Sequence, residues 1–130
     1  MTTFSVLVTK PPYDSEHALK ALRYCENLLQ SGQIVDHVFF YQGGVNNANS
    51  LISPPSDEIN LYQGWVDLLA RYPSLKLLVC VTAATKRGLV NQQYANELGI
   101  SQFTVQEPFA QAGLGDFFTR LHDCKQLVQF

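Results

Sequence analysis

The chain carries little charge and has no long apolar run. Of its 130 residues 15% are charged, and the formal net charge is −2. The nine lysines and arginines are scattered, so we expect no basic surface of the kind that holds a phosphate backbone. No apolar run approaches the roughly 20 residues that span a bilayer, and no signal-peptide pattern is present. These absences predict a cytoplasmic protein with no membrane contact and at most an indirect link to nucleic acid.

Cysteine and histidine are also scarce. The three cysteines, Cys25, Cys80 and Cys124, are odd in number and widely spaced, which argues against a disulfide framework. There is no CxxC pair, and the histidines lie far apart in the chain, at His17, His37 and His122. We therefore expect no metal site and no cofactor.

Motifs for nucleotides and for serine hydrolases are missing as well. Gly113-Leu114-Gly115 is a GxG, but Phe118 stands where a dinucleotide-binding loop has its third glycine, and the motif lies late in the chain. No P-loop and no GxSxG elbow occurs. The simpler interpretation is that these glycines are small residues required where a helix begins.

Apolar patterns predict strands that alternate with helices. Strands are expected at residues 4–9, 34–41, 75–81, 101–106 and 126–130, and helices at about 14–30, 57–71, from 82 onward, 91–98 and 113–122. The helix over 57–71 should turn Ile59 and Trp65 toward the core. This alternation indicates a parallel sheet with helices on both faces, in a single domain over residues 1–130.

The segment after the second strand, QGGVNNANSLISPPSDE, is rich in glycine, asparagine, serine and proline. This composition predicts that most of it lacks regular structure. A loop of this length is typically functional or mobile. We expect residues 42–56 to pack against a partner subunit or to border a pocket at Cys80; a mobile surface loop is the alternative.

The cysteines differ in their expected surroundings. Cys25 belongs to the apolar stripe of the first helix, which predicts plain packing. Cys124 follows Asp123, whose negative charge opposes a thiolate, so we interpret it as structural.

Cys80 ends the apolar strand over 75–81, at the position where open α/β sheets place reacting groups. Lys86 and Arg87 follow closely and, with the backbone N–H groups of the next segment, could stabilise the nucleophilic thiolate. No base lies beside Cys80 in the sequence, which disfavours a Cys–His hydrolase, whereas persulfide exchange needs only an accessible thiolate. The residues alone leave packing and chemistry as open alternatives for Cys80.

Three long segments resemble the DsrE/TusD family of sulfur-relay proteins, and its TusD members most closely. They are VFFYQGGVNNANSLISPPSDE (38–58), VCVTAATKRGLVN (79–91) and FAQAGLGDFFTRLHDCKQLVQF (109–130). The middle segment has the family pattern of a cysteine, small residues, a basic pair and a glycine: Cys80, Ala83-Ala84, Lys86-Arg87 and Gly88. The family usually has Ala at Thr82, Arg at Lys86 and Asp at Asn91, and the last difference removes a negative charge.

The resemblance implies a three-layer α/β/α fold with a five-stranded, mainly parallel sheet. It implies a sulfurtransferase in which Cys80 accepts persulfide sulfur from a TusA-like donor and passes it to a TusE-like acceptor, for 2-thiolation of the tRNA wobble uridine. TusB-like and TusC-like subunits would complete a dimer of heterotrimers. A DsrE-type subunit of sulfur oxidation, a non-catalytic scaffold subunit and, more remotely, a Cys-dependent hydrolase are the alternatives.

Overall fold

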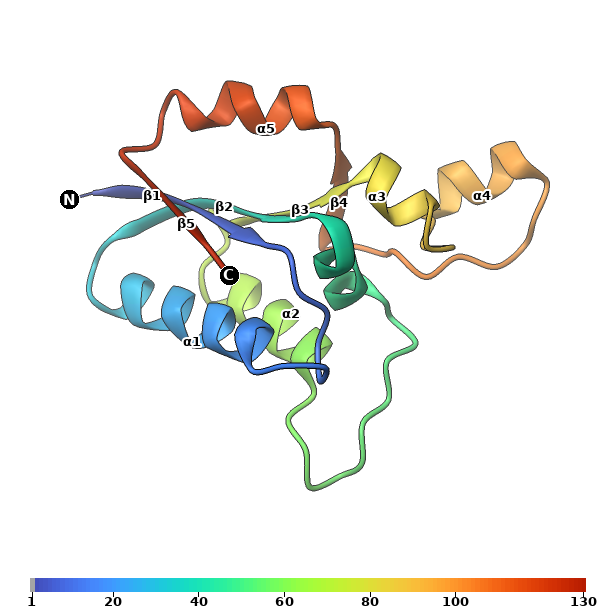
Figure 1. Cartoon of the computed structure of the whole chain (residues 1–130), viewed down its shortest axis with the longest axis horizontal. Helices are drawn as coiled ribbons and strands as arrows, with labels where there is room; N and C mark the ends of the chain where they lie inside the picture. Colours follow the sequence, from blue (N-terminus) through green and yellow to red (C-terminus); the bar gives the residue numbers. More distant parts are fainter. Residues whose placement is uncertain (1) are drawn as a thin grey trace.

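A computed structural model describes residues 2–130 and shows a five-stranded parallel sheet with helices on both faces (Figure 1). This confirms the expected α/β/α architecture. The strand order is β4-β3-β2-β1-β5. The strands are β1 (Thr3–Val8), β2 (Ile34–Phe40), β3 (Lys76–Cys80), β4 (Phe109–Ala112) and β5 (Gln126–Gln129). The helices are α1 (His17–Gln30), the 3-10 helix η1 (Gln42–Ala48), α2 (Leu61–Arg71), α3 (Val81–Thr85), α4 (Gln92–Leu98) and α5 (Leu114–Leu121).

The strand order explains which helix covers which face. From β1 to β4 each new strand joins the same side of the sheet, so right-handed crossovers place α1 and α2 on one face. The chain then returns to the other side of β1 to form β5, and the crossover helix α5 covers the opposite face (Figure 1). The first and last strands of the chain therefore lie side by side.

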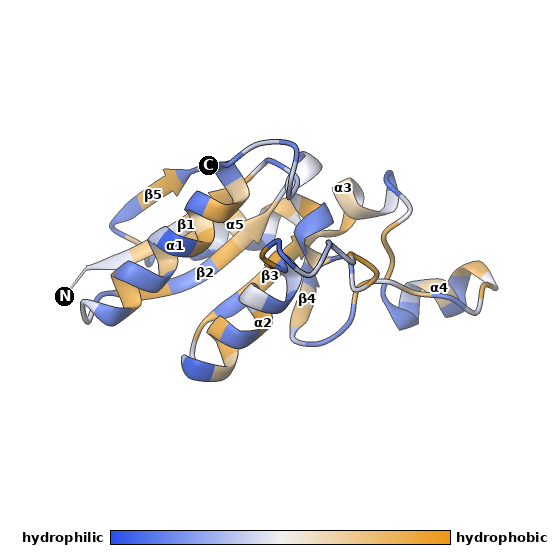
Figure 2. Cartoon of the chain, turned by 90° about the horizontal axis from the view of Figure 1, so that it is seen from below, coloured by the Kyte–Doolittle hydropathy of each residue, from blue (hydrophilic) through white to orange (hydrophobic). Residues whose placement is uncertain are grey.

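Two neighbouring aromatic residues of β2 join the sheet to both helical layers. Successive side chains of a strand point to opposite faces. Phe40 meets Trp65 of α2 edge-on at 5.2 Å between ring centroids, whereas Phe39 stacks on Phe117 of α5 at 4.5 Å. The strands are apolar because the sheet is buried on both faces. Helices α1 and α2, in contrast, alternate hydrophobic with hydrophilic stretches (Figure 2). Within residues 2–130, no helix has the length and apolar character needed to cross a membrane.

The segment after β2 combines a short helix with a longer irregular part. Its first seven residues form η1, whereas residues 49–58 form no helix or strand, so the expectation that most of the segment lacks regular structure is confirmed. A Cβ atom on Gly44 would lie 1.9 Å from the carbonyl oxygen of Val8, and only glycine permits this close approach to β1. Asn47 is wholly buried; its amide group donates to the carbonyls of Lys10 and Gly44 and accepts from Trp65 Nε1. η1 is therefore part of the core, whereas residues 49–58 are half-buried or exposed.

The strand expected at 101–106 is wrong. The backbone N–H groups of Thr104 and Val105 both donate to the carbonyl of Val90, at 3.0 Å each, so this stretch binds the loop before α4 and not the sheet. The fourth strand is β4, which pairs with β3 although its sequence, FAQA, has only one residue of high β propensity. Pairing with a buried neighbour outweighs the local preference.

The helix expected over 57–71 begins later, at Leu61. Asn60 precedes it, and the Asn60 side chain accepts a hydrogen bond from the Gln63 N–H, as an N-cap does. Ile59 therefore lies outside the helix and is exposed, contrary to its expected place in the core. Its carbonyl accepts a hydrogen bond from the Tyr13 hydroxyl.

Candidate active site

Cys80 is the last residue of β3, at the carboxyl edge of the sheet. The neighbouring strands β2 and β4 run parallel to β3 and end at the same edge, where Cys80 pairs with Ala112. The residues that follow these strands, Tyr41 and Gln42 after β2 and Leu114 after β4, therefore meet around Cys80. The position fits the prediction that the cysteine lies where α/β sheets place reacting groups.

A hollow of about 350 Å³ opens at this edge and is called the Cys80 hollow below. Its lining comes from three chain segments: Tyr41, Gln42, Cys80, Thr82, Ala83, Lys86, Arg87 and Leu114. The structure thus brings together Cys80, Lys86 and Arg87, the three residues that the sequence singled out. Gln42 confirms that the segment after β2 borders this pocket. Nothing in the sequence pattern pointed to Tyr41 or Leu114, which reach the hollow only through strand pairing.

The Cys80 hollow is cationic in character. Lys86 is exposed, and Arg87 is fixed over α3 because its Nη1 donates to the carbonyl of Ala83 at 3.0 Å. Among the described residues that line the hollow, none is acidic. Cys80 itself is 2% exposed and precedes the first turn of α3, so a reagent reaches its thiol through the hollow.

No histidine of the described chain lines the Cys80 hollow. His37 is wholly buried, where Nε2 bonds to Ser5 Oγ at 2.7 Å and Nδ1 to Asp36 Oδ2 at 2.8 Å, while His17 and His122 are exposed elsewhere. The Cys–His pairing that a hydrolase requires therefore has no support at this site.

The backbone at the entrance to the hollow is held in an uncommon conformation. Gln42 has φ +51°, a left-handed value that favours glycine. Hydrogen bonds on either side fix it there, because the Tyr41 N–H donates to the Val8 carbonyl and the Gly44 N–H to the Tyr41 carbonyl. Strained residues of this kind are often found at functional sites.

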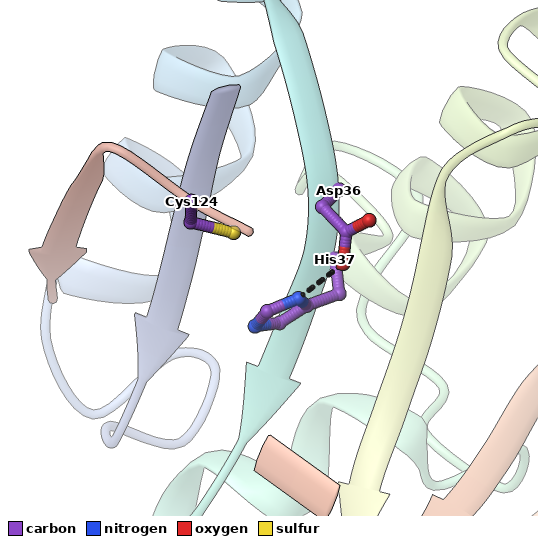
Figure 3. A group of neighbouring side chains, drawn as sticks. All are labelled: Asp36, His37 and Cys124. Atoms are coloured by element: carbon purple, nitrogen blue, oxygen red, sulfur yellow. Dashed lines mark hydrogen bonds and ion pairs between the residues drawn. The ribbon is translucent and has the colours of Figure 1, made fainter. Parts of the chain in front are cut away.

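A second cluster of titratable side chains lies elsewhere, and no local sequence pattern pointed to it. Asp36, His37 and Cys124 bring one ligand atom each to within 4.8 Å of the others (Figure 3). The wide spacing of the histidines in the sequence led us to expect no metal site, and it did not reveal that these three side chains meet. Distance along the sequence did not predict this proximity, for two reasons. β5 returns beside β1, and the pairing of β1 with β2 shifts register between Phe4 and Ser5. The extra residue on β2 is Asp36, and this bulge brings its carboxylate to the ring of His37.

The surroundings shift the pKa values of His37, Asp36 and Cys124 in different directions. Burial lowers the pKa of His37 and outweighs the opposing effect of Asp36. Burial alone would raise the pKa of Asp36, but hydrogen bonds from His37 and Arg120 lower it overall. Burial raises the pKa of Cys124, and the carboxylates of Asp36 and Asp123 raise it further, in agreement with a structural thiol.

Cys25 is wholly buried on α1, and this burial raises the pKa of its thiol well above the usual range. The prediction that Cys25 is a packing residue is confirmed. Of the three cysteines, Cys80 is thus the one that lies in a cationic hollow.

Comparison with known proteins gives consistent results over the whole chain. The model of the DsrE/DsrF-like family matches residues 3–130. Sulfurtransferase TusD of Proteus mirabilis (strain HI4320) is 41% identical over 128 residues, which are 98% of each chain. Among solved structures, the YchN protein of E. coli superposes with a TM-score of 0.76 at 18% identity, with both chains fully covered. A protein of unknown function from Methanobacterium thermoautotrophicum gives 0.66 at 13%, also with full coverage; at these identities the two structures show a shared fold alone.

Proposed function

The chain belongs to the DsrE/DsrF-like family and is a sulfurtransferase, and from this premise we propose that Cys80 carries the transferred sulfur as a persulfide. One observation supports this assignment above the others. Cys80 lies at the carboxyl edge of the sheet in a hollow with Lys86 and Arg87, whereas Cys25 is sealed in the core and Cys124 lies beside acidic groups.

The proposed reaction consists of two balanced exchanges. The Cys80 thiolate attacks the outer sulfur of a donor persulfide, an S–S bond forms at Cys80, and the donor leaves as a thiolate. An acceptor thiolate then attacks the outer sulfur on Cys80, and Cys80 is released as a thiolate. Each step exchanges one S–S bond for another, so no external oxidant or reductant is consumed.

Lys86 and Arg87 would stabilise the anionic forms of this cycle. Both the free thiolate and the persulfide anion carry negative charge, and the two cations line the hollow that contains the sulfur. Charge interactions at partly exposed sites are worth roughly 0.3–1 kcal/mol. Lys86→Gln and Arg87→Gln should therefore slow loading of Cys80 about two- to fivefold each.

The likeness to sulfurtransferase TusD of Proteus mirabilis supports a proposal for the wider role. We propose a TusA-like donor, a TusE-like acceptor, and TusB-like and TusC-like subunits that assemble with this chain as a dimer of heterotrimers in the cytoplasm. The sulfur would end as 2-thiouridine at the tRNA wobble position, with no direct contact between this chain and tRNA. A DsrE-type role in sulfur oxidation is the alternative, and loss of 2-thiouridine in a deletion strain separates the two.

The decisive experiment is mass spectrometry after incubation with a persulfide-loaded donor. We expect the wild-type chain to gain the mass of one sulfur on the peptide that contains Cys80. Cys80→Ser should abolish the gain, whereas Cys124→Ser, the matched control, should retain it. A gain that survives Cys80→Ser would refute the assignment, and a Cys80→Ser chain that supports normal tRNA thiolation in cells would favour a scaffold role.

A further inference from the structure

We propose that Asp36, His37 and Cys124 form a zinc-binding site, separate from the Cys80 hollow. A carboxylate oxygen, an imidazole nitrogen and a thiolate sulfur are the three kinds of protein ligand that zinc takes. Here one of each converges from two chain segments, and the ligand atoms lie within 4.8 Å of one another (Figure 3). The cluster lies toward the amino ends of the strands, whereas Cys80 lies at their carboxyl ends.

Small movements bring these atoms into coordination. Tetrahedral ligands at the usual zinc distances of roughly 2.0–2.3 Å are about 3.3–3.8 Å apart. The imidazole and carboxylate, now 2.8 Å apart, would open by about half an ångström, and the sulfur would approach by about one. Cys124 belongs to the connection between α5 and β5. Within residues 2–130 its sulfur makes a single hydrogen bond, a long one to the carbonyl of Arg120 at 3.4 Å, so rotation of the Cys124 side chain breaks one weak hydrogen bond.

Ser5 allows His37 to change its tautomer while the hydrogen bond between the Ser5 hydroxyl and Nε2 is kept. In the structure Nδ1 faces the Asp36 carboxylate and is its donor, so Nε2 accepts from the Ser5 hydroxyl. When Nδ1 binds the metal, the single N–H proton of the neutral ring moves from Nδ1 to Nε2, so the ring stays neutral. The Ser5 hydroxyl can then accept from Nε2, because a hydroxyl is both donor and acceptor. Ser5 would thus orient the ring from outside the coordination sphere, as the partners of zinc-bound histidines do.

Arg120 is the group that opposes the metal. Its Nη1 donates to Asp36 Oδ2 at 3.2 Å, so the bound cation and the guanidinium compete for one carboxylate. Arg120 and Asp36 are both partly exposed, so the guanidinium can turn toward solvent and water can supply the fourth ligand. On binding, the Cys124 thiol loses its proton, and the S–H bond is replaced by a bond from sulfur to zinc.

The test is titration of the full chain with Co(II), a spectroscopic substitute for zinc, followed by competition with Zn(II). All proteins carry Cys80→Ser, so the metal cannot bind at the Cys80 hollow. We expect one equivalent of Co(II) to give a sulfur-to-cobalt charge-transfer band that Zn(II) removes. Cys124→Ser should abolish the band, Asp36→Asn should weaken affinity about tenfold, and Arg120→Met should strengthen it several-fold. Cys25→Ala, which removes a thiol elsewhere, should leave the band intact.

Two results would overturn the site. One is the absence of a stoichiometric band; the other is a band that persists in Cys124→Ser. Far-ultraviolet circular dichroism verifies that each variant is folded, and Asp36→Asn, which keeps the size of the side chain, provides a second variant if Cys124→Ser is unstable. Unchanged affinity in a folded Asp36→Asn chain would also contradict the proposal.

Discussion

Asn47 shows how a single polar side chain can organise the core. It is wholly buried, yet its amide satisfies two carbonyls and accepts from the indole of Trp65 at 3.3 Å. These bonds hold η1 against the segment after β1 and against α2. Because η1 begins with Gln42, the same bonds position one wall of the Cys80 hollow.

Asn47→Ala should therefore destabilise the chain by about 2–4 kcal/mol, since it leaves buried polar groups without partners. Urea unfolding measures the change in the free energy of unfolding. The matched control is Asn46→Ala, because Asn46 is only partly buried and donates to Gly43 alone, and its loss should cost less than about 1 kcal/mol. Equal effects of the two substitutions would contradict this role of Asn47.

The chemistry of single residues was predictable from sequence only where neighbours in the chain are neighbours in space. Cys80, Lys86 and Arg87 lie within one strand–helix connection, so the motif already placed them together. Asp36 and Cys124 are brought together by a strand bulge and by a strand that returns from the far end of the chain. No local pattern encodes such a meeting.

At the scale of elements, helices and strands were predicted correctly where the buried residues recur in a clear sequence pattern. The stripe that contains Cys25 marked α1, and the apolar run that ends in Cys80 marked β3. It failed at β4, whose four residues form a strand only because β3 offers a partner, while the better local candidate at 101–106 binds the loop before α4. Strand pairing is a long-range interaction, and short edge strands depend on it most.

Helices α1 and α2 are joined by an ionic contact that should make stability depend on pH. Burial alone would raise the pKa of Glu26, but hydrogen bonds from Arg23 on α1 and Arg71 on α2 lower it overall. A lowered pKa in the folded state means that the stabilisation is present above the unfolded value of 4.5 and is lost as the pH falls through the folded value.

Glu26→Gln should thus lower the midpoint of thermal unfolding at pH 7, and the difference from wild type should shrink steadily below about pH 4.5. Thermal scans between pH 3 and pH 7 measure it. Glu16→Gln is the control, because Glu16 makes only an exposed pair with Lys20 at 3.5 Å and its removal should change little at any pH. A gap between Glu26→Gln and wild type that stays constant with pH would refute the ionic explanation.

At the scale of the whole molecule, the two ends of the chain are tied into one sheet. β1 pairs with β2 on one side and β5 on the other, and the backbone of Phe130 bonds to Leu7 and Thr9. No part of the sheet can therefore detach without breaking contacts between distant segments. We expect the chain to unfold as a single domain.

This expectation is tested by unfolding in urea with two probes. Trp65 is the sole tryptophan, is wholly buried between α2 and the sheet, and reports tertiary packing through its fluorescence. Far-ultraviolet circular dichroism reports the helices. The two transitions should coincide at one midpoint. Separate midpoints would show that part of the structure, such as the region of α3 and α4, unfolds on its own.

The edges of the sheet have a consequence for assembly. Both outer strands, β4 and β5, have four residues each, fewer than a typical strand. A protein that joins another by strand addition needs a long row of free backbone groups, and short edges provide few. We therefore expect a subunit that associates with this chain to contact side chains on its helices and loops. The specificity of this chain for one related subunit over another would then depend on surface residues, which can diverge while the common sheet is preserved.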